Sequence, residues 1–246
     1  MIADPTTPAS IRLSPALAGL AAALCLGGSA FAAEAPYPAM APIAAYMVSN
    51  QADEIVLARS AAPPSVSADA EVMVLGAHGY EVAAKGRNGF VCMVERSWAS
   101  DFTDPEYWNP KIRAPICFNP VSARSVLPTY LKQTAWLLAG ASKAQLIDRT
   151  RAALVAHELT APAAGAMCFM MSRQGYSSDK VAGPWKPHLM FFTPPSEPGA
   201  WGANLPGVPI MGGGGEVDQV SVFFVSVGTW SDGAPASAPA HVMAKM

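Results

Sequence analysis

The sequence predicts an α+β fold built around an antiparallel sheet. Three apolar, strand-forming runs come first, two helical segments follow, and three further strand-like runs come last. Strands and helices that are grouped in blocks, rather than alternating one by one, are typical of α+β domains. We therefore expect a three-strand meander, a helix pair and three further strands, all within a single domain over residues 33–232.

A short helix is expected over residues 52–62, ahead of the meander. Asp53 and Glu54 lie in its first turn and Arg59 lies near its end, which is the charge order that the helix dipole favours. Prolines follow directly and end the helix, because proline cannot continue it.

The meander is expected over residues 72–75, 80–84 and 90–96. Asn88-Gly89 is the strongest turn signal in the chain, because this pair tolerates the positive φ angles of a tight hairpin turn. Both faces of the third run are mainly apolar. A strand of that kind is covered on both sides, so we expect it at the centre of the sheet.

An extended segment is expected over residues 114–118, and the helix pair follows over residues 120–140 and 143–158. Asn119 precedes Pro120, which combines an N-cap residue with a proline in the first turn, and the first helix should be interrupted or kinked near Pro128. In the second helix the apolar residues fall on one face and the charged residues are turned away from it.

The last block consists of apolar runs over residues 166–172, 188–193 and 220–230. We expect these runs to be strands joined by loops rich in Gly and Pro, among them the glycine run at 212–215. The end of the chain, 233–246, is rich in Ala and Pro and is predicted to be a disordered tail.

Residues 1–32 are typical of an export signal. Arg12 precedes an apolar run over 13–31, and Ala30-Phe31-Ala32 has the A-x-A pattern that signal peptidase accepts. The run is too short and too rich in Ala and Gly for a membrane span, and no later stretch reaches the ~20 apolar residues that a span needs. We therefore predict a signal peptide cleaved near Ala32, a periplasmic or secreted protein, and no stable membrane insertion.

Export also permits disulfide bonds. Cys25 lies within the predicted signal, so Cys92, Cys117 and Cys168 remain in the mature chain. Cys92 and Cys117 each lie in a short apolar run, and we predict that they form a disulfide. Cys168 is then the spare cysteine, which we interpret as a buried apolar thiol; a reactive nucleophile is the alternative, although no local motif supports it.

Charge and motifs exclude several classes of function. The chain carries 16 basic and 18 acidic residues, and neither kind is clustered. A protein that binds nucleic acid or an anionic membrane surface has a basic patch, so we expect neither partner. The sequence lacks the common nucleotide, serine-hydrolase and zinc-protease motifs, and no cysteine pair has metal-ligand spacing, so we expect no cofactor and no metal.

His188 is the histidine with the best case for a functional role. It opens an apolar strand after a proline-bracketed loop, and an antiparallel pairing of 166–172 with 188–193 would place Ser172 opposite it. Ser172 and His188 could then act as nucleophile and base, with Glu95 completing a polar site. The alternatives are structural: a histidine that caps a strand, and a glutamate that belongs to a buried ion pair.

Aromatic residues gather in the connecting loops. Trp98, Tyr107 and Trp108 fall in one connector, and Trp185 and Trp201 fall in two others. Such residues either anchor a loop to the core or form a platform that binds sugars or peptides. Long loops in a compact domain need anchoring, so we favour the first interpretation.

Three runs carry a resemblance: 88–96 (NGFVCMVER), 113–118 (RAPICF) and 185–192 (WKPHLMFF). They look like stretches in a group of uncharacterised exported bacterial proteins. The resemblance covers most of the mature domain and fits an exported protein with a Cys92–Cys117 bridge. It implies no activity, cofactor or catalytic residue.

The sequence therefore favours an exported binding or accessory module of the bacterial envelope. Its partner would be an unknown small molecule or envelope component. A hydrolase with a site centred on His188 is one alternative. A structural or interaction protein that uses its aromatic loops is the other.

Overall fold

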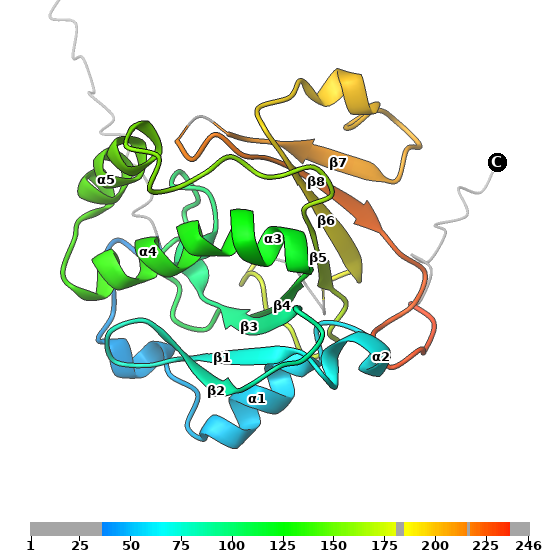
Figure 1. Ribbon diagram of the computed structural model, residues 1–246, viewed down its shortest axis with the longest axis horizontal. Helices are drawn as coiled ribbons and strands as arrows, with labels where there is room; N and C mark the ends of the chain where they lie inside the picture. The colour runs from blue at the N-terminus through cyan, green and yellow to red at the C-terminus, as the bar shows by residue number, and fades with distance from the viewer. Residues whose placement is uncertain (1–35, 181–184, 216, 237–246) are drawn as a thin grey trace, which may run out of the picture. The chain divides into compact units, whose positions relative to one another are not determined.

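The computed structural model describes residues 36–180, 185–215 and 217–236. They form an eight-stranded sheet in the order β2-β1-β3-β4-β5-β6-β8-β7, with helices on both faces (Figure 1). The predicted α+β class with a mainly antiparallel sheet is confirmed.

The strands are β1 (Glu71–Leu75), β2 (Tyr80–Ala84), β3 (Val91–Glu95), β4 (Ala114–Phe118), β5 (Met167–Met170), β6 (His188–Thr193), β7 (Ile210–Gly213) and β8 (Ser221–Ser226). The helices are α1 (Gln51–Arg59), α2 (Pro64–Ser67), α3 (Pro120–Ser125), α4 (Leu127–Leu138) and α5 (Lys143–Val155), with short 3-10 segments η1 (Ile43–Tyr46), η2 (Ser97–Ala99) and η3 (Pro198–Trp201).

The order of the first strands differs from the predicted meander. β1 and β2 form an antiparallel hairpin, but β3 pairs with the other edge of β1 and runs parallel to it. After β2 the chain returns to the start of β1, where Glu71 N–H donates to Phe90 O at 2.9 Å. The Asn88-Gly89 turn, with Gly89 at φ 77°, therefore lies in this return segment and does not join two antiparallel strands.

The number of strands also differs from the prediction. The segment expected to be extended over 114–118 is a full strand, β4, which pairs with β3 and β5, and β7 is an added strand at the edge beside β8. Part of the predicted glycine loop at 212–215 thus belongs to β7. Gly212 suits this place because a Cβ atom there would lie 2.5 Å from the ring of Phe223 on β8, so glycine allows the two strands to approach.

The predicted helix over 120–140 is two helices, α3 and α4, which meet at Val126. The Asn119 side chain caps α3 as predicted, because it accepts from Ser122 N–H at 2.8 Å. Pro128 lies in the first turn of α4, where its missing N–H leaves no hydrogen bond unmade. The helix is thus interrupted at Val126, close to Pro128, as predicted.

Alternate residues of each strand point to opposite faces of the sheet. One face packs against α1, and we call it the closed face. The other face packs in part against α3 and α4, and we call it the cavity face. The predicted central position of β3, covered on both sides, is confirmed. The closed face carries Val72, Cys92, Val94 and Cys117, and the cavity face carries Met93, Glu95, Ile116, Cys168, Met190 and Phe192.

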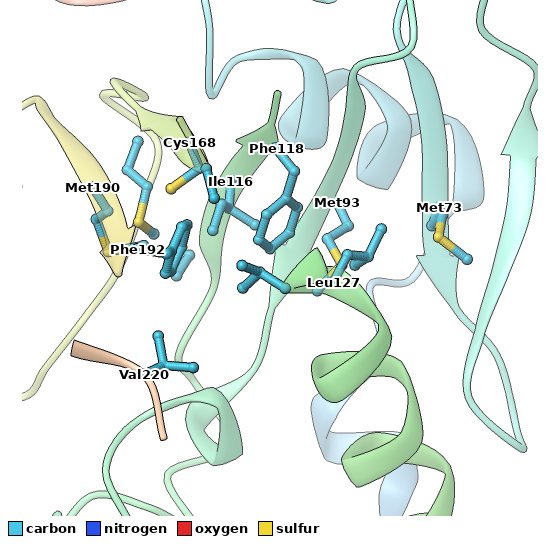
Figure 2. Close-up of a cluster of buried hydrophobic side chains, with 13 residues drawn as sticks. Met73, Met93, Ile116, Phe118, Leu127, Cys168, Met190, Phe192 and Val220 are labelled. Carbon is cyan, nitrogen blue, oxygen red and sulfur yellow. The ribbon is translucent and has the colours of Figure 1, made fainter. Parts of the chain in front are cut away.

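An apolar cluster holds α4 on the cavity face (Figure 2). The rings of Phe118 and Phe192 stack with their centroids 6.2 Å apart. Leu127, at the start of α4, belongs to the same cluster, and Tyr130 meets Phe118 edge-on at 5.5 Å. These contacts fix the rotation of α4 and so decide which of its side chains reach the sheet. Cys168 is buried in this cluster as a free thiol.

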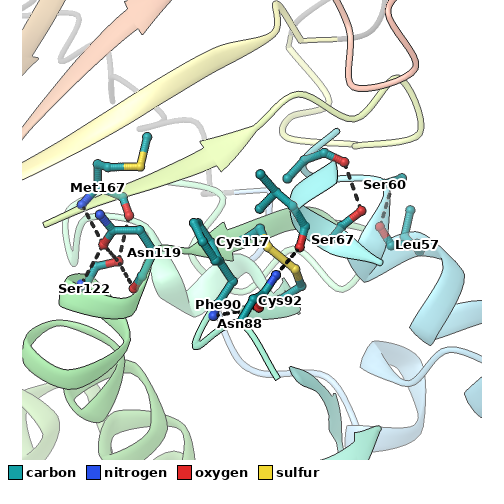
Figure 3. Close-up of a disulfide and its surroundings, with 12 residues drawn as sticks. Leu57, Ser60, Ser67, Asn88, Phe90, Cys92, Cys117, Asn119, Ser122 and Met167 are labelled. Atoms are coloured by element: carbon teal, nitrogen blue, oxygen red, sulfur yellow. Dashed lines mark hydrogen bonds between the residues drawn. A yellow bond between two sulfur atoms is a disulfide. The ribbon is translucent and has the colours of Figure 1, made fainter. Parts of the chain in front are cut away.

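Cys92 and Cys117 lie opposite each other on β3 and β4 and are joined by a disulfide on the closed face (Figure 3). Their Cα atoms are 4.0 Å apart. The fold thus brings together the pair that the sequence predicts. The two cysteines are 25 residues apart in the sequence, so the bond closes a covalent ring. This ring of chain contains η2 and the loop up to β4.

Two predictions concern the chain ends. The signal segment over 1–32 and its cleavage site lie outside the described residues, as does most of the predicted tail. Residues 233–236, at the start of that tail, fold back on the segment before them: Trp230 N–H donates to Ala234 O at 2.9 Å, and Thr229 and Pro235 form an antiparallel bridge. In the described ranges, no helix has the length and apolar character that a membrane crossing requires.

Candidate functional site

A cavity of about 1260 Å³ lies against the cavity face of the sheet. The strand residues in its wall all belong to that face because they follow the same alternation along their paired strands. The rest of the wall comes mainly from α4, from the segment between β3 and β4, and from the connections between β5 and β6 and between β7 and β8, with Ile147 of α5. Among the strand residues in the wall are Glu95 (β3), Ala114 (β4), His188 and Met190 (β6), and Val222 and Phe224 (β8).

Glu95 places a carboxyl group in this mainly apolar wall. The residue is 6% exposed, and no described group forms a hydrogen bond with its Oε1 atom. Burial disfavours the charged form and raises the pKa of Glu95 to about 8. Glu95 is therefore mainly protonated at neutral pH, and it offers both a hydrogen-bond donor and an acceptor to the cavity.

Arg96, the next residue, has a separate structural role. Its side chain is buried and donates to Glu54 Oε1 and to Tyr46 O, each at 2.7 Å. This ion pair ties β3 to α1. The buried ion pair that the sequence suggested for Glu95 is thus made by its neighbour, and Glu95 takes no part in an ion pair with any described residue.

Neutral hydroxyl and thiol groups surround Glu95. Tyr80 of β2 donates its hydroxyl to Val94 O at 2.7 Å, and its pKa is raised by burial. Tyr130 of α4 is partly buried and Cys168 of β5 is buried, and burial together with the charge of Glu95 raises the pKa of each. All three groups stay uncharged at neutral pH, so they do not neutralise an ionised Glu95.

His188 lines the same cavity. Its Nδ1 atom lies 2.8 Å from Lys186 O, and its ring meets Trp185 edge-on with the centroids 5.5 Å apart. A carbonyl oxygen can only accept, so Nδ1 carries the proton and Nε2 is left as an acceptor. Burial lowers the pKa of His188, against a smaller opposing effect of the backbone hydrogen bond, so the ring is neutral at pH 7.

Ser172 lies outside the cavity. β5 and β6 pair in antiparallel fashion as predicted, but His188 lies opposite Met170 and not opposite Ser172. The chain leaves the sheet after Met170, and Ser172 Oγ lies 2.6 Å from Ser60 Oγ at the end of α1. The structure therefore brings Glu95 and His188 to one cavity and holds the third predicted site residue elsewhere.

Tyr130 and Asp218 are among the wall residues that were not predicted from the sequence. Tyr130 lies one helical turn after Leu127, and this spacing could have placed both on the sheet side of α4. Asp218 lies between the glycine run and β8, and its Oδ1 accepts from Val220 N–H at 3.3 Å. Burial is the main cause that raises the pKa of Asp218. The sequence feature that could have indicated Asp218 is the position of an acidic residue directly before an apolar strand.

The aromatic loop residues act mainly as anchors. Trp98 is buried and donates its Nε1–H to Thr134 Oγ1 of α4 at 3.0 Å. Tyr107 and Trp108 meet edge-on with their centroids 4.7 Å apart. Trp185 lines the cavity and donates its Nε1–H to a backbone carbonyl at 2.6 Å. The Trp98 contact holds the loop after β3 against α4, where this loop forms part of the cavity wall.

Neither a protein-family model, nor a curated protein sequence, nor a solved structure matches this chain. In the part of the chain that the structure describes, no three His, Cys, Asp or Glu side chains are grouped so that they could hold a metal ion. The case for a function therefore rests on the cavity and on the groups that line it.

Proposed function

We propose that this protein is an exported binding module that holds a small, mainly apolar molecule in the cavity. The volume of about 1260 Å³ is more than enough for a drug-sized ligand. Met190, Val222 and Phe224 supply an apolar surface, and Glu95, Tyr130 and His188 supply a few polar groups. An apolar pocket with few polar groups is typical of a small-molecule site.

The observation that carries this proposal is the unpartnered carboxyl of Glu95. A buried polar atom without a hydrogen bond costs roughly 1–3 kcal/mol, and native proteins leave few such atoms. A ligand that hydrogen-bonds to Glu95 would remove this cost while its apolar part covers the cavity wall. The carboxyl group would thus orient the ligand, and the apolar surface would supply most of the affinity.

Ligand binding can be tested with Nile red, an uncharged dye that fluoresces in apolar surroundings. We expect the dye to bind and decan-1-ol to displace it. Val222→Trp should fill part of the cavity and lower the affinity for the dye at least tenfold. Val82→Trp is the matched control, because Val82 is 51% exposed on β2 and lies outside the cavity wall.

Circular dichroism should show that both variants remain folded. Equal dye binding by the wild type and the folded Val222→Trp variant would contradict the proposal. So would a wild-type protein that binds neither Nile red nor decan-1-ol.

The export part of the proposal has its own support and its own test. The N-terminal segment has the form of a signal, and a disulfide is favoured in an oxidising compartment. We expect the mature protein in the periplasm or the medium, with a mass that places its N-terminus near Ala33. Recovery of the uncleaved chain from the cytoplasm would contradict export.

A hydrolase is the second candidate, because a carboxyl group and an imidazole, those of Glu95 and His188, line one cavity. Glu95 with a raised pKa and neutral His188 could act as general acid and base on a bound ester. We expect p-nitrophenyl butyrate to be hydrolysed above the buffer rate if this candidate is right, with the excess rate lost in Glu95→Gln and His188→Ala. A rate equal to that of buffer would exclude esterase activity on this substrate.

A further inference from the structure

The acidic groups around the cavity outnumber the basic groups. Glu95, Asp218, Asp101 and Asp104 line it, from β3, from the connection before β8 and from the loop after η2. The basic groups in the described wall are Arg96, Lys186 and His188. An apolar cavity with an excess of carboxyl groups favours a positively charged ligand over a negatively charged one.

The basic groups are not placed to balance Glu95. Arg96 is committed to Glu54 and to backbone carbonyls, and its side chain lies on the α1 side of β3. His188 is kept neutral by burial. Lys186 is exposed to solvent. Water and salt screen the charge of Lys186, so this residue contributes little to the electrostatic potential inside the cavity.

Two of the four acids already have partners in the loop after η2. Asp101 accepts from Thr103 N–H and from the Thr103 hydroxyl, and Asp104 accepts from Glu106 N–H. These contacts shape the loop. Glu95, with one oxygen that has no partner among the described residues, is the acid left for a ligand. Asp218, which accepts a single long backbone hydrogen bond at 3.3 Å, is a second and weaker candidate.

The elements packed against Glu95 bring no cation to it. β2 contributes Tyr80, α4 contributes Tyr130 and β5 contributes Cys168, all uncharged at neutral pH. Ala114 of β4 lies directly opposite Glu95. Asp218 is near enough to Tyr130 for its charge to raise the pKa of that hydroxyl. A cation beside Glu95 would therefore meet hydroxyl groups and a second acid.

We infer that the ligand is an amphipathic amine, whose ammonium group forms an ion pair with Glu95 while its apolar part covers Met190, Val222 and Phe224. This inference rests on the proposed binding function and specifies its ligand class. An alcohol of the same length could only hydrogen-bond to Glu95. A carboxylate would add a further negative charge to a wall that already has an acid excess.

Binding of an amine beside Glu95 should release a proton, and this release can be measured. An alkylamine carries a proton at pH 7, whereas Glu95 with a pKa of about 8 is protonated by roughly ten to one. Formation of the ion pair transfers the proton of Glu95 to solvent, so nearly one proton is released for each amine bound. Between pH 6.5 and 8.5 the amine affinity should rise about 25-fold, because the carboxylate form becomes available.

Decylamine, decan-1-ol and decanoate make a matched series for the test. We expect decylamine to displace Nile red at least tenfold more effectively than decan-1-ol at pH 7.5, and decanoate to be the weakest. Calorimetry in Tris and in phosphate should report the released proton through the difference in buffer ionisation heat. In Glu95→Gln the preference for amine over alcohol and the proton release should both disappear, while decan-1-ol still binds.

The control and the contrary outcomes separate the two proposals. Glu81→Gln makes the same change at an exposed position on β2 and should leave the amine preference intact. If decan-1-ol binds and decylamine binds no more tightly, or if decanoate binds best, the amine inference is wrong and the binding function stands. If none of the three compounds displaces the dye, the binding function itself fails.

Discussion

The closed face and the cavity face of the sheet are built from the same strands but are covered in different ways. On the closed face, Val94 packs with Ala58 of α1 in a cluster of buried residues. On the cavity face, Met93 packs under α3 and α4, whereas Glu95, two residues along the same strand, faces the cavity. Close packing on one side of β3 shows that the strand itself does not cause the empty volume. The cavity comes from how α4 and the connections between β3 and β4, between β5 and β6 and between β7 and β8 cover the other side.

Val94 and Glu95 show this difference at adjacent positions. Val94 is 0% exposed and Glu95 is 6% exposed, so both are removed from water. One is apolar and tightly packed, and the other is polar and faces open space. The degree of burial therefore does not distinguish a core position from a site position. The two positions differ in whether the side chain faces packed atoms or an open cavity.

The largest expected effect comes from moving the carboxyl group to the closed face. Val94→Glu would bury an acid among apolar side chains with no cavity, so we expect the free energy of unfolding at pH 8 to fall by about 5 kcal/mol, or folding to fail. Glu95→Val should cost nothing or increase stability at the same pH. Urea unfolding followed by tryptophan fluorescence measures both, and equal losses in the two variants would remove the distinction between the faces.

The next effect is the pH dependence that Glu95 gives to folding. Its pKa rises on folding from 4.5 to about 8, so this group stabilises the folded state most below pH 4.5, and that contribution is lost as the pH rises towards 8. Over this range we expect the free energy of unfolding to decrease by on the order of 4 kcal/mol relative to Glu95→Gln. Parallel curves of unfolding free energy against pH for the two proteins would show that Glu95 is not buried as described.

The disulfide gives a somewhat smaller effect that should be confined to the closed face. Removing the bond with Cys92→Ser and Cys117→Ser together should lower the free energy of unfolding by about 3.5 kcal/mol in the loop-entropy model. Nile red binding by the folded variant should change little, because neither cysteine lines the cavity. Mass spectrometry of unreduced protein from the periplasm should show the two cysteines linked, and three free thiols would contradict the bridge.

The smallest effect concerns the second acid of the cavity face. Asp218→Asn should weaken decylamine binding about threefold, less than Glu95→Gln does, because a partly hydrated carboxylate contributes less than a buried one. The affinity for decan-1-ol should stay the same. A larger loss for Asp218→Asn than for Glu95→Gln would move the ammonium site from β3 to the connection before β8.

Local patterns in the sequence predicted those features that depend on neighbouring residues. The two-sided apolar run of β3 indicated a central strand, the Asn119 cap marked the start of α3, and two cysteines in apolar runs indicated the disulfide. The pairing of β1 with β3 could not be predicted, because a parallel pair carries no turn signal between its members. A strand order of this kind is set by long-range packing.

The site could be predicted in part for the same reason. Glu95 and His188 were visible as polar residues at the ends of apolar strands, and the fold brings those two ends to one cavity. Ser172 was misplaced because nothing in the sequence shows that β5 ends at Met170 and that the chain then turns towards α1. Tyr130 could be assigned to the site only once the rotation of α4 on the sheet was known.

The ring of chain closed by the disulfide has a consequence for how the protein would withstand proteases. The loop between β3 and β4, which forms part of the cavity wall, lies inside that ring. A single cut in this loop would leave the two fragments covalently linked, with β3 and β4 still paired across the bond. In gel electrophoresis such a nicked protein would migrate as one species without reductant and as two species with it. It could keep its ligand, whereas without the disulfide the same cut would open the cavity wall.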